Sequence, residues 1–248
     1  MPQNTFLFVR SADRVAGTSS RFTVNCPQTY KNVTACSLVS AELPTVYNVD
    51  TIFCAGVTIT YNGTSLALVI SAGFYTIADI VAWLLATLQG SLSAAGVTAV
   101  TYSTTTGKIS IVYSGTQAFS IQNNSAGSFG RILGTDPLGL VTFGTGGVLT
   151  LPYIATLAPM NTILLRIGEL PNICTSTNNQ HSTFRLQIAA AAGSLNFQNA
   201  ASSTYNNCVY NAPVLTVPTL TISLWTAEGN QIDLRGIEWT FTMLITSS

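Results

Sequence analysis

The stretch VTITYNGTSLALVI (residues 57–70) decides the fold class, because two alternating runs of residues flank an Asn-Gly pair. Every second residue from Val57 to Tyr61 is apolar or aromatic, which is the period of a half-buried strand. Asn62 and Gly63 suit the two positive-φ positions that a two-residue type I′ hairpin turn requires. The stretch therefore predicts a β-hairpin.

The same period of two recurs along most of the chain and predicts further strands. They are expected near residues 22–24, 33–41, 97–103, 108–113, 149–154, 162–170, 183–190, 209–210 and 219–226. A last hairpin is expected in LWTAEGNQIDLRGIEWTFTMLI (residues 224–245), with Trp239, Phe241 and Met243 on one face. The Gly-rich stretch 134–152 and the small-residue stretch 189–201 are predicted loops.

One segment, YTIADIVAWLLATLQG (residues 75–90), departs from this period and predicts a helix. Its apolar residues recur three and four positions apart, which places them on one helical face. They are Ile77, Ile80, Val81, Leu84, Leu85, Leu88 and Leu92. Thr76 followed by Asp79 has the spacing of a capping box. A second short helix is expected at residues 128–133, ended by Gly134.

Many short strands, frequent turns and one or two short helices in connections favour an all-β fold. The strand count predicts a single jelly-roll sandwich of two four-stranded antiparallel sheets over residues 22–248, preceded by an N-terminal arm over residues 1–21. A chain of 248 residues can bury enough surface for such a core without disulfides.

Charged residues are few in this chain, and this limits the kinds of partner that it can attract. Charged residues make up 7% of the chain, and nine cations balance nine anions, whereas about 25% is usual in soluble domains. A neutral chain has no long-range attraction for nucleic acid or anionic lipid. The sequence contains no run of 18 apolar residues, so no membrane-spanning helix is predicted. Ser, Thr, Asn and Gln replace charge on the surface, which favours a subunit that is largely covered in an assembly.

The sequence offers little material for catalysis. His181 is the only histidine and lies in a polar stretch, with no nearby carboxylate in sequence to orient its ring. FGTGGVLT (residues 143–150) lacks the third glycine and the following helix of a dinucleotide-binding loop. We therefore expect no enzyme, no catalytic residue, no cofactor and no metal.

The cysteines do not form a metal or disulfide motif. There are five of them, an odd number, and no two lie within nine residues of each other: Cys26, Cys36, Cys54, Cys174 and Cys208. This spacing argues against a disulfide framework and against a C-x-x-C metal site. We expect synthesis in the cytoplasm or the nucleus, where thiols stay reduced.

Four segments, in this order, resemble a known family. They are SADRVAGTSSRFTV (residues 11–24), YKNVTACSLVSAELPTVYNV (30–49), GFYTIADIVAWLLATL (73–88) and the terminal stretch 224–245. Together they resemble the penton-type single jelly-roll capsid proteins of large double-stranded DNA viruses and virophages. The matching features are Leu43-Pro44 at a strand end, a Gly73-x-Tyr75-Thr step before the helix, and a terminal strand pair that carries Trp239.

This resemblance implies a structural viral capsid protein, the penton subunit at the vertex of an icosahedral virion. It implies a homopentameric ring and contacts with neighbouring major and minor capsid proteins. Two alternatives remain open: a minor capsid or cement protein built on one jelly roll, and a carbohydrate-binding β-sandwich, since jelly rolls also serve as lectin scaffolds.

Four charged residues gather early in a chain that has few. They are Arg10, Asp13, Arg14 and Arg21. A closed ring uses two different patches of each subunit, which meet on adjacent copies. Charge-assisted hydrogen bonds from these arginines would give such a contact direction and register. We therefore predict these four as subunit-interface residues, with Asp13 pairing within the arm or across it.

Overall fold

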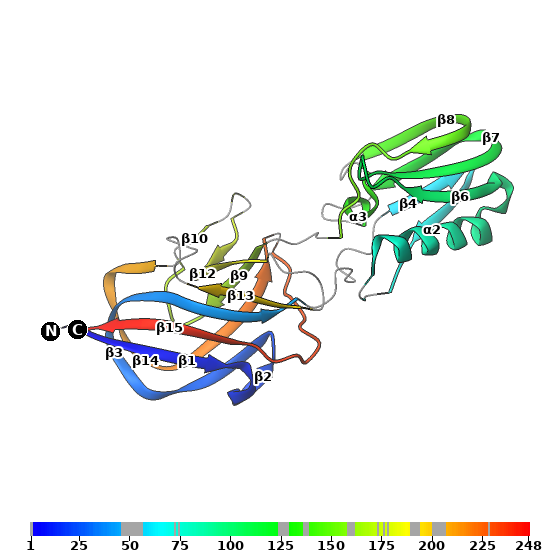
Figure 1. Ribbon diagram of the computed structural model, residues 1–248. Helices are drawn as coiled ribbons and strands as arrows, with labels where there is room; N and C mark the ends of the chain where they lie inside the picture. The colour runs from blue at the N-terminus through cyan, green and yellow to red at the C-terminus, as the bar shows by residue number, and fades with distance from the viewer. Residues whose placement is uncertain are drawn as a thin grey trace. The chain divides into compact units, whose positions relative to one another are not determined.

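The computed structural model describes residues 2–45, 57–71, 73, 75–123, 129–135, 139–157, 162–172, 174–175, 177, 179–188, 194–199, 207–227 and 229–248. The chain divides into two compact units (Figure 1). Unit 1 comprises Met1–Val46 and Met160–Ser248, and unit 2 comprises Tyr47–Pro159. Nearly all the regular structure is antiparallel strand, so the predicted all-β class is confirmed. Unit 2 is an insertion between two strand-rich halves of unit 1.

Unit 1 holds one hydrogen-bonded sheet of eight strands, in the order β1-β15-β3-β14-β9-β12, with β13 and β2 also paired to β3. The strands are β1 (Gln3–Arg10), β2 (Ala16–Thr18), β3 (Arg21–Pro44), β9 (Thr162–Ile167), β12 (Phe184–Gln187), β13 (Leu195–Asn199), β14 (Asn207–Thr226) and β15 (Thr240–Ser247). The two long strands, β3 and β14, curl around the unit (Figure 1). Register shifts interrupt their ladder, and such bulges bend a strand. The eight strands are thus joined through β3 and β14 rather than split into two separate four-stranded ladders.

The core of unit 1 lies between the inner faces of this curled sheet. Trp239 is buried, stacks on Phe241 with ring centroids 5.2 Å apart and meets the edge of Phe22 at 6.0 Å. Its indole Nε1 donates to the Ser19 carbonyl oxygen at 2.7 Å, which satisfies the one polar atom of the ring. The predicted inward face of the last strand is confirmed, because Met243 is buried as well.

The N-terminal segment differs from the predicted arm. Residues 3–10 form β1, which pairs along its whole length with β15, from Gln3 opposite Ser247 to Arg10 opposite Thr240. A short 3-10 helix (Ser11–Asp13) and β2 then lead into β3. The two chain ends therefore lie side by side (Figure 1). The stretch 1–21 belongs to the same compact unit as the last strands, and the expected boundary at residue 22 coincides with no division of the structure.

Unit 2 holds a five-stranded antiparallel sheet in the order β5-β4-β7-β6, with β8 also paired to β7. Its strands are β4 (Val57–Tyr61), β5 (Thr64–Leu68), β6 (Val97–Tyr102), β7 (Ile109–Asn123) and β8 (Gly139–Thr150). Asn62 and Gly63 take positive φ values of 48° and 75° between β4 and β5, so the hairpin predicted from Asn-Gly is confirmed. The hairpin of β6 and β7 is confirmed likewise.

Helix α2 (Ile77–Ser91) covers one face of this sheet (Figure 1). Thr76 and Asp79 form the predicted capping box: the Thr76 hydroxyl accepts from the Asp79 backbone and the Asp79 carboxylate accepts from the Thr76 backbone. Ile80, Leu84 and Leu88 are fully buried against the sheet. The three- and four-residue spacing of the apolar residues thus predicted the buried face of α2 correctly. A helix of this length is stabilised mainly by burying such an apolar face.

Two segments predicted as loops contain strands. β8 lies inside the Gly-rich stretch 134–152 and pairs with β7 from Gly139 to Thr150. β13 lies inside 189–201 and pairs with β3. Both strands are held by pairing with a distant or longer strand rather than by local propensity. The short helix α3 (Gly130–Leu133) is confirmed and ends at Gly134, whose φ is 80°.

Candidate subunit interface

Three of the four predicted interface charges form ion pairs within the chain, beside the junction of β1 and β15. The Arg10 guanidinium binds the Asp13 carboxylate with two hydrogen bonds, Nε to Oδ2 at 2.8 Å and Nη2 to Oδ1 at 2.5 Å. Both side chains remain about half exposed. The hydrogen bonds from Arg10 lower the pKa of the Asp13 carboxyl. Asp13 therefore pairs within its own segment.

Arg14 joins the N-terminal segment to the end of the chain. Its Nη1 lies 2.6 Å from Glu238 Oε1 and donates to the Ser11 carbonyl oxygen at 2.8 Å. The Ser11 hydroxyl donates to the other Glu238 oxygen and accepts from the Trp239 backbone N–H at 2.9 Å. Hydrogen bonds from Ser11 and then from Arg14 lower the pKa of the Glu238 carboxyl. Sequence reasoning missed Ser11 and Glu238, because their partners lie more than 200 positions away.

Arg21 stands apart from this network. It begins β3, lies opposite Thr18 of β2 and Ser223 of β14, and its side chain is exposed. Its backbone N–H donates to the Thr18 hydroxyl at 3.2 Å. The structure thus brings Arg10, Asp13 and Arg14 together and leaves Arg21 at the opposite end of the segment.

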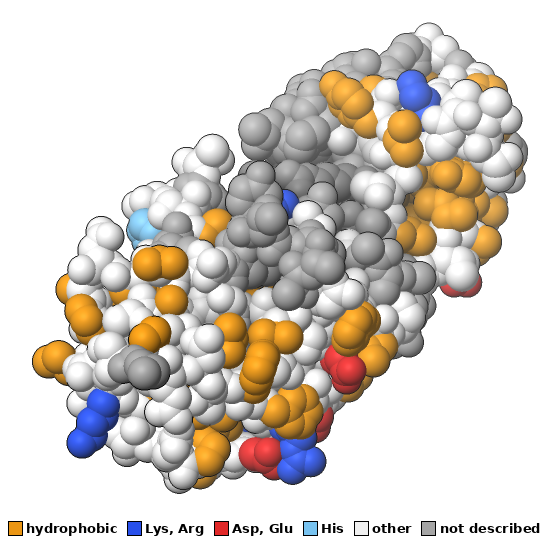
Figure 2. Space-filling model, turned by 60° about the vertical axis from the view of Figure 1, so that its left-hand side comes forward, with side chains coloured by type: hydrophobic (Ala, Val, Ile, Leu, Met, Phe, Trp, Pro, Cys, Tyr) orange, Lys and Arg blue, Asp and Glu red, His pale blue; other side chains and the backbone are white. Residues whose placement is uncertain are grey.

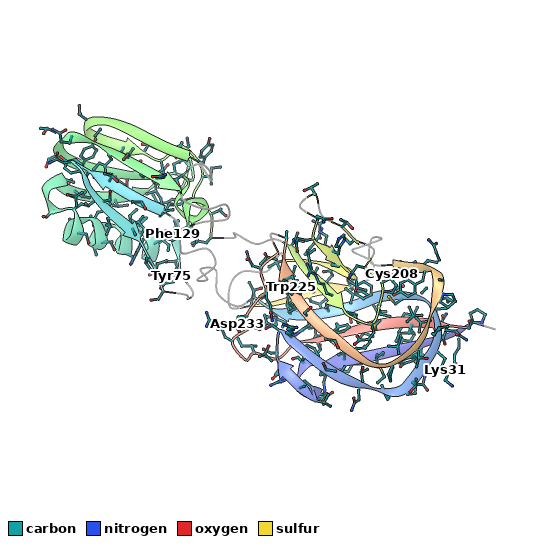
Figure 3. All side chains as sticks on the ribbon, turned by 180° about the vertical axis from the view of Figure 1, so that it is seen from behind. Lys31, Tyr75, Phe129, Cys208, Trp225 and Asp233 are labelled. Carbon is teal, nitrogen blue, oxygen red and sulfur yellow. The ribbon has the colours of Figure 1, made fainter. Side chains whose placement is uncertain are left out.

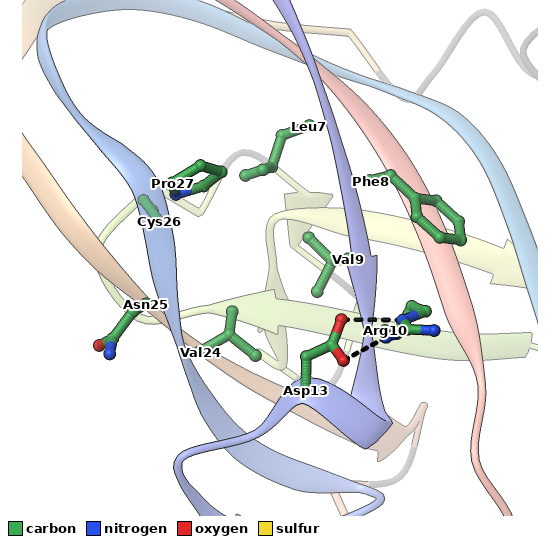
Figure 4. Close-up of a pocket in the computed structure, with 9 residues that line it drawn as sticks. All are labelled: Leu7, Phe8, Val9, Arg10, Asp13, Val24, Asn25, Cys26 and Pro27. Atoms are coloured by element: carbon green, nitrogen blue, oxygen red, sulfur yellow. Dashed lines mark hydrogen bonds and ion pairs between the residues drawn. The ribbon is translucent and has the colours of Figure 1, made fainter.

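Unit 1 exposes large apolar side chains on the outer face of two of its strands, β1 and β13. In β1, Leu7 and Val9 are buried, whereas Phe6 and Phe8 are 67% and 60% exposed. Figure 4 shows Phe8 on the opposite side of β1 from Leu7 and Val9. Aromatic side chains are normally the most buried part of a sheet, so two exposed phenylalanines on one strand require an explanation.

Strand β13 has the reverse of the usual pattern. Its polar residues Asn196 and Gln198 are buried, whereas Leu195 and Phe197 are 57% and 60% exposed. The buried amides are satisfied by β12: Asn196 Nδ2 donates to the Gln187 carbonyl oxygen at 2.7 Å, and Gln198 Oε1 accepts from the Gln187 N–H at 3.0 Å. A strand that turns its apolar residues outward normally serves another contact.

The two strands belong to one surface, which we call the aromatic face: Phe6, Phe8, Leu195 and Phe197. Register places Phe8 opposite Thr242 of β15, which lies opposite Ser40 of β3. The next row runs from Arg10 through Thr240 and Glu42 to Phe197. Four strands at about 4.8 Å spacing place β1 roughly 14 Å from β13 across the sheet, with the hydroxyl side chains of Thr240, Thr242 and Ser40 and the carboxylate of Glu42 between them. Figure 2 shows how uncharged the surface is: orange apolar patches on white, with few charged groups.

A shallow hollow borders this region between β1 and the first part of β3. It has a volume of about 140 Å³ and is lined by Leu7, Phe8, Val9, Arg10, Asp13, Val24, Asn25, Cys26 and Pro27 (Figure 4). Burial, and then the charge of Glu169, raise the pKa of the Cys26 thiol to about 11. The thiol is thus protonated at neutral pH, and the hollow presents apolar walls with one ion pair.

The residues considered for catalysis remain isolated. His181 lies in the short strand β11 (His181–Ser182), paired with β10 (Cys174–Thr175), and its Nδ1 is 3.0 Å from the Thr175 hydroxyl. Within the described parts of the chain, no cluster of three His, Cys, Asp or Glu side chains could hold a metal ion. Residues 143–150 lie in β8 rather than in a phosphate-binding loop. No described helix is long and apolar enough to span a membrane.

Comparison with known proteins supports the fold and gives no sequence family. No protein-family model matches the chain, and no curated protein matches its sequence. Among solved structures, the chain is similar to the crystal structure of a selenomethionine-labelled mavirus penton protein. The similarity covers 99% of this chain and 100% of that chain, with a TM-score of 0.53 and 10% sequence identity. The resemblance found in the sequence is therefore confirmed at the level of the fold, across both units.

Proposed function

We propose that this chain is a penton-type capsid protein, a structural and non-enzymatic subunit that forms a five-membered ring at the vertex of an icosahedral double-stranded DNA virus. The aromatic face carries the proposal: four large apolar side chains are exposed on two strands, one of which buries polar residues in exchange. The shared fold with a mavirus penton protein, over the full length of both chains, agrees with it.

The surface around the aromatic face suits contact with another protein. Hydroxyl side chains of Thr240, Thr242 and Ser40 separate the apolar groups, and Glu42 and Arg10 are the charges in the same rows. Interface centres are depleted in charge and enriched in aromatic residues. Covering phenylalanine rings removes apolar area from water at roughly 25 cal/mol per Å², and little charge must be desolvated to do so.

The charged residues fit the edge of such a contact. The Arg10–Asp13 pair is about half exposed and adjoins the aromatic face through Arg10. We propose that Arg10, Asp13, Arg14 and Arg21 lie at the rim, where charges fix orientation more than they add affinity. In a ring, the aromatic face would meet a different patch of the adjacent copy, because a closed ring uses heterologous contacts.

A minor capsid or cement role is the second candidate. It uses the same aromatic face but places neighbouring major or minor capsid proteins, rather than copies of this chain, against it. The low charge of the whole surface favours a covered subunit in both cases. In either role the chain resides in the virion.

The carbohydrate-binding alternative finds little support in the aromatic residues. Sugar-binding sites stack a ring face on the ligand, but Trp239 is buried in the core of unit 1. The Arg166 guanidinium carbon lies 4.4 Å from the centroid of the half-buried Trp225 ring and covers it (Trp225 is labelled in Figure 3). Trp83 is half-buried and packs edge-on against Phe129.

Native mass spectrometry across a concentration series tests the proposal. We expect a discrete species at five times the 26.2 kDa chain mass. A monomer at every concentration that binds a capsid shell from the same virus would favour the cement role. A monomer that neither assembles nor binds a shell would contradict both structural roles.

A further inference from the structure

Two cysteines that are far apart in the sequence lie opposite each other in unit 1. Cys36 of β3 and Cys208 of β14 are direct partners in the antiparallel ladder. Both are buried, at 1% and 0% exposure, and both are free thiols. Directly opposed residues of an antiparallel pair have Cα atoms about 4.5–5.5 Å apart, a separation that a disulfide spans without backbone movement.

The two thiols lie close enough to shift each other's pKa, and the Cys36 sulfur lies 2.7 Å from the Tyr210 hydroxyl oxygen. The Cys208 sulfur also lies 3.3 Å from the Thr183 carbonyl oxygen. Both sulfurs therefore point to the same side of the sheet and lie within one polar pocket of the core (Cys208 is labelled in Figure 3).

The polar surroundings make the two cysteines unequal. Hydrogen bonds from Cys208 and Tyr210 to its sulfur lower the pKa of the Cys36 thiol despite its burial. The same interaction with Cys36, together with burial, raises the pKa of the Cys208 thiol. Cys36 is therefore the member of the pair that loses its proton first and becomes the nucleophile.

The ladder around the pair is short, which gives a small oxidant a route to it. Only three residues of β14, Asn207 to Val209, pair with β3 before the register shifts between Val209 and Val214. Tyr210 follows and is buried, and the residues after it, Asn211 to Pro213, are exposed. Short ladder segments beside a bulge open locally at less cost than the whole fold.

We propose that Cys36 and Cys208 are an oxidation site that forms an intramolecular disulfide between β3 and β14 when the protein meets a peroxide. The Cys36 thiolate attacks hydrogen peroxide to give a sulfenic acid and hydroxide, which takes up a proton to become water. The Cys208 sulfur then attacks the Cys36 sulfur, its proton leaves, and the sulfenic hydroxyl departs as a second water. Two thiols lose two electrons in total, and one peroxide is reduced to two waters.

The Cys36–Cys208 disulfide would cross-link β3 to β14, two strands that lie far apart in the sequence. The linked residues are about 170 positions apart, and cross-linking a long loop constrains the unfolded chain strongly. The bond would also span the insertion of unit 2, which lies between the two cysteines in the sequence. We expect the melting temperature of unit 1 to rise by roughly 5 °C or more on oxidation and to return on reduction.

The test treats the folded full-length chain with limiting hydrogen peroxide, then denatures it in maleimide and measures intact mass. We expect maleimide to label all five cysteines before oxidation and three after it. The oxidised chain itself should be lighter by two hydrogens. Peptide mapping of the wild-type protein should place the link between Cys36 and Cys208. Substitution Cys36→Ala should abolish the link, whereas the matched Cys26→Ala should retain it.

Three outcomes would overturn the proposal. One is retention of all five free thiols after peroxide. Another is a link that maps to Cys174 and Cys208. The third is sulfinic acid at Cys36 with no link. Because the mapping uses the wild-type chain, it stands even if Cys36→Ala lowers stability by leaving a small cavity.

Discussion

The two units of this chain differ in which apolar side chains they leave exposed. Unit 2 buries its amphipathic stripe internally: Ile80, Leu84 and Leu88 of α2 are all fully buried against its own sheet. Unit 1 has its own core, yet it also exposes Phe6, Phe8 and Phe197 on one face. Unit 2 also leaves apolar side chains exposed, namely Val69, Val148, Tyr153 and Ile154, but the exposed phenylalanines of the described chain all lie in unit 1, on the face that we propose meets a further partner.

The units also differ in where charge is used. The described ion pairs all lie in unit 1, and two of them fasten the N-terminal segment beside the aromatic face. In unit 2 the Asp79 carboxylate serves the cap of α2 instead. Two of the three described ion pairs therefore fix the geometry of the N-terminal segment.

The largest expected effect is on the core of unit 2. Leu84→Ala removes a fully buried side chain between α2 and the sheet, which should cost about 2–5 kcal/mol of stability. Hydrogen exchange should show lost protection in α2, β6 and β7, with β3 and β15 unchanged. Loss of protection in both units alike would show that the two cores do not behave separately.

The next effect separates the two faces of β13. Asn196→Ala leaves the Gln187 carbonyl oxygen without its 2.7 Å partner and should cost about 1–3 kcal/mol of stability. Its neighbour Phe197→Ala, on the exposed face, should change stability by less than about 0.5 kcal/mol. Urea unfolding of the two variants measures both values, and a costlier Phe197 change would mean that the ring is already packed within the subunit.

A smaller, pH-dependent effect is expected at Glu238. Hydrogen bonds from Ser11 and Arg14 lower the pKa of Glu238 in the folded chain. Its contribution is therefore present above the unfolded carboxyl pKa of about 4.3 and is lost as pH falls through the lower folded value. Because the group is 40% exposed, the contribution should stay below about 1 kcal/mol.

Thermal unfolding between pH 7 and pH 3 checks this effect. The wild-type chain should lose more stability over that range than Glu238→Gln, with Asp233→Asn, which changes a carboxylate that pairs with Arg235 instead, as the control. If stability falls equally with pH in the wild type and in Glu238→Gln, the Arg14–Glu238 contact does not stabilise the pairing of the chain ends.

The smallest effect is chemical rather than energetic. Burial, and then Glu169, raise the pKa of Cys26 to about 11. At pH 8 the folded chain should therefore alkylate at this position on the order of 100-fold more slowly than an unfolded peptide, because the thiolate is the reacting species. Alkylation rates between pH 7 and pH 11 measure this, and a rate that levels off near pH 8.5 would contradict the burial of Cys26 beside β1.

Local signals in the sequence predicted the local parts of the fold. The Asn62-Gly63 turn, the capping box at Thr76 and the spacing of Leu84 and Leu88 each act within a few residues, so the hairpin and helix were predictable. The strands β8 and β13 were not, because Gly-rich and polar stretches have low strand propensity and form strands through pairing, β8 with the preceding β7 and β13 with the distant β3.

The candidate interface was predictable only in part. The cluster of Arg10, Asp13 and Arg14 drew attention to the region where these charges form ion pairs, but the sequence could not show that Glu238 would complete the network. The run FLFV (residues 6–9) fell within the predicted N-terminal arm, and an unbroken apolar run does not reveal which face lies in water. The exposure of Phe6 and Phe8 follows from the pairing of β1 with β15, at the far end of the chain.

The central claim is that the aromatic face holds a neighbouring subunit. The most direct test compares native mass spectra of Phe8→Ser/Phe197→Ser with those of Leu215→Ser, which changes an equally exposed apolar residue of β14 outside that face. We expect the double variant to keep its fold and shift to monomer, whereas Leu215→Ser stays assembled. A folded double variant that still forms the same five-subunit species would contradict the claim.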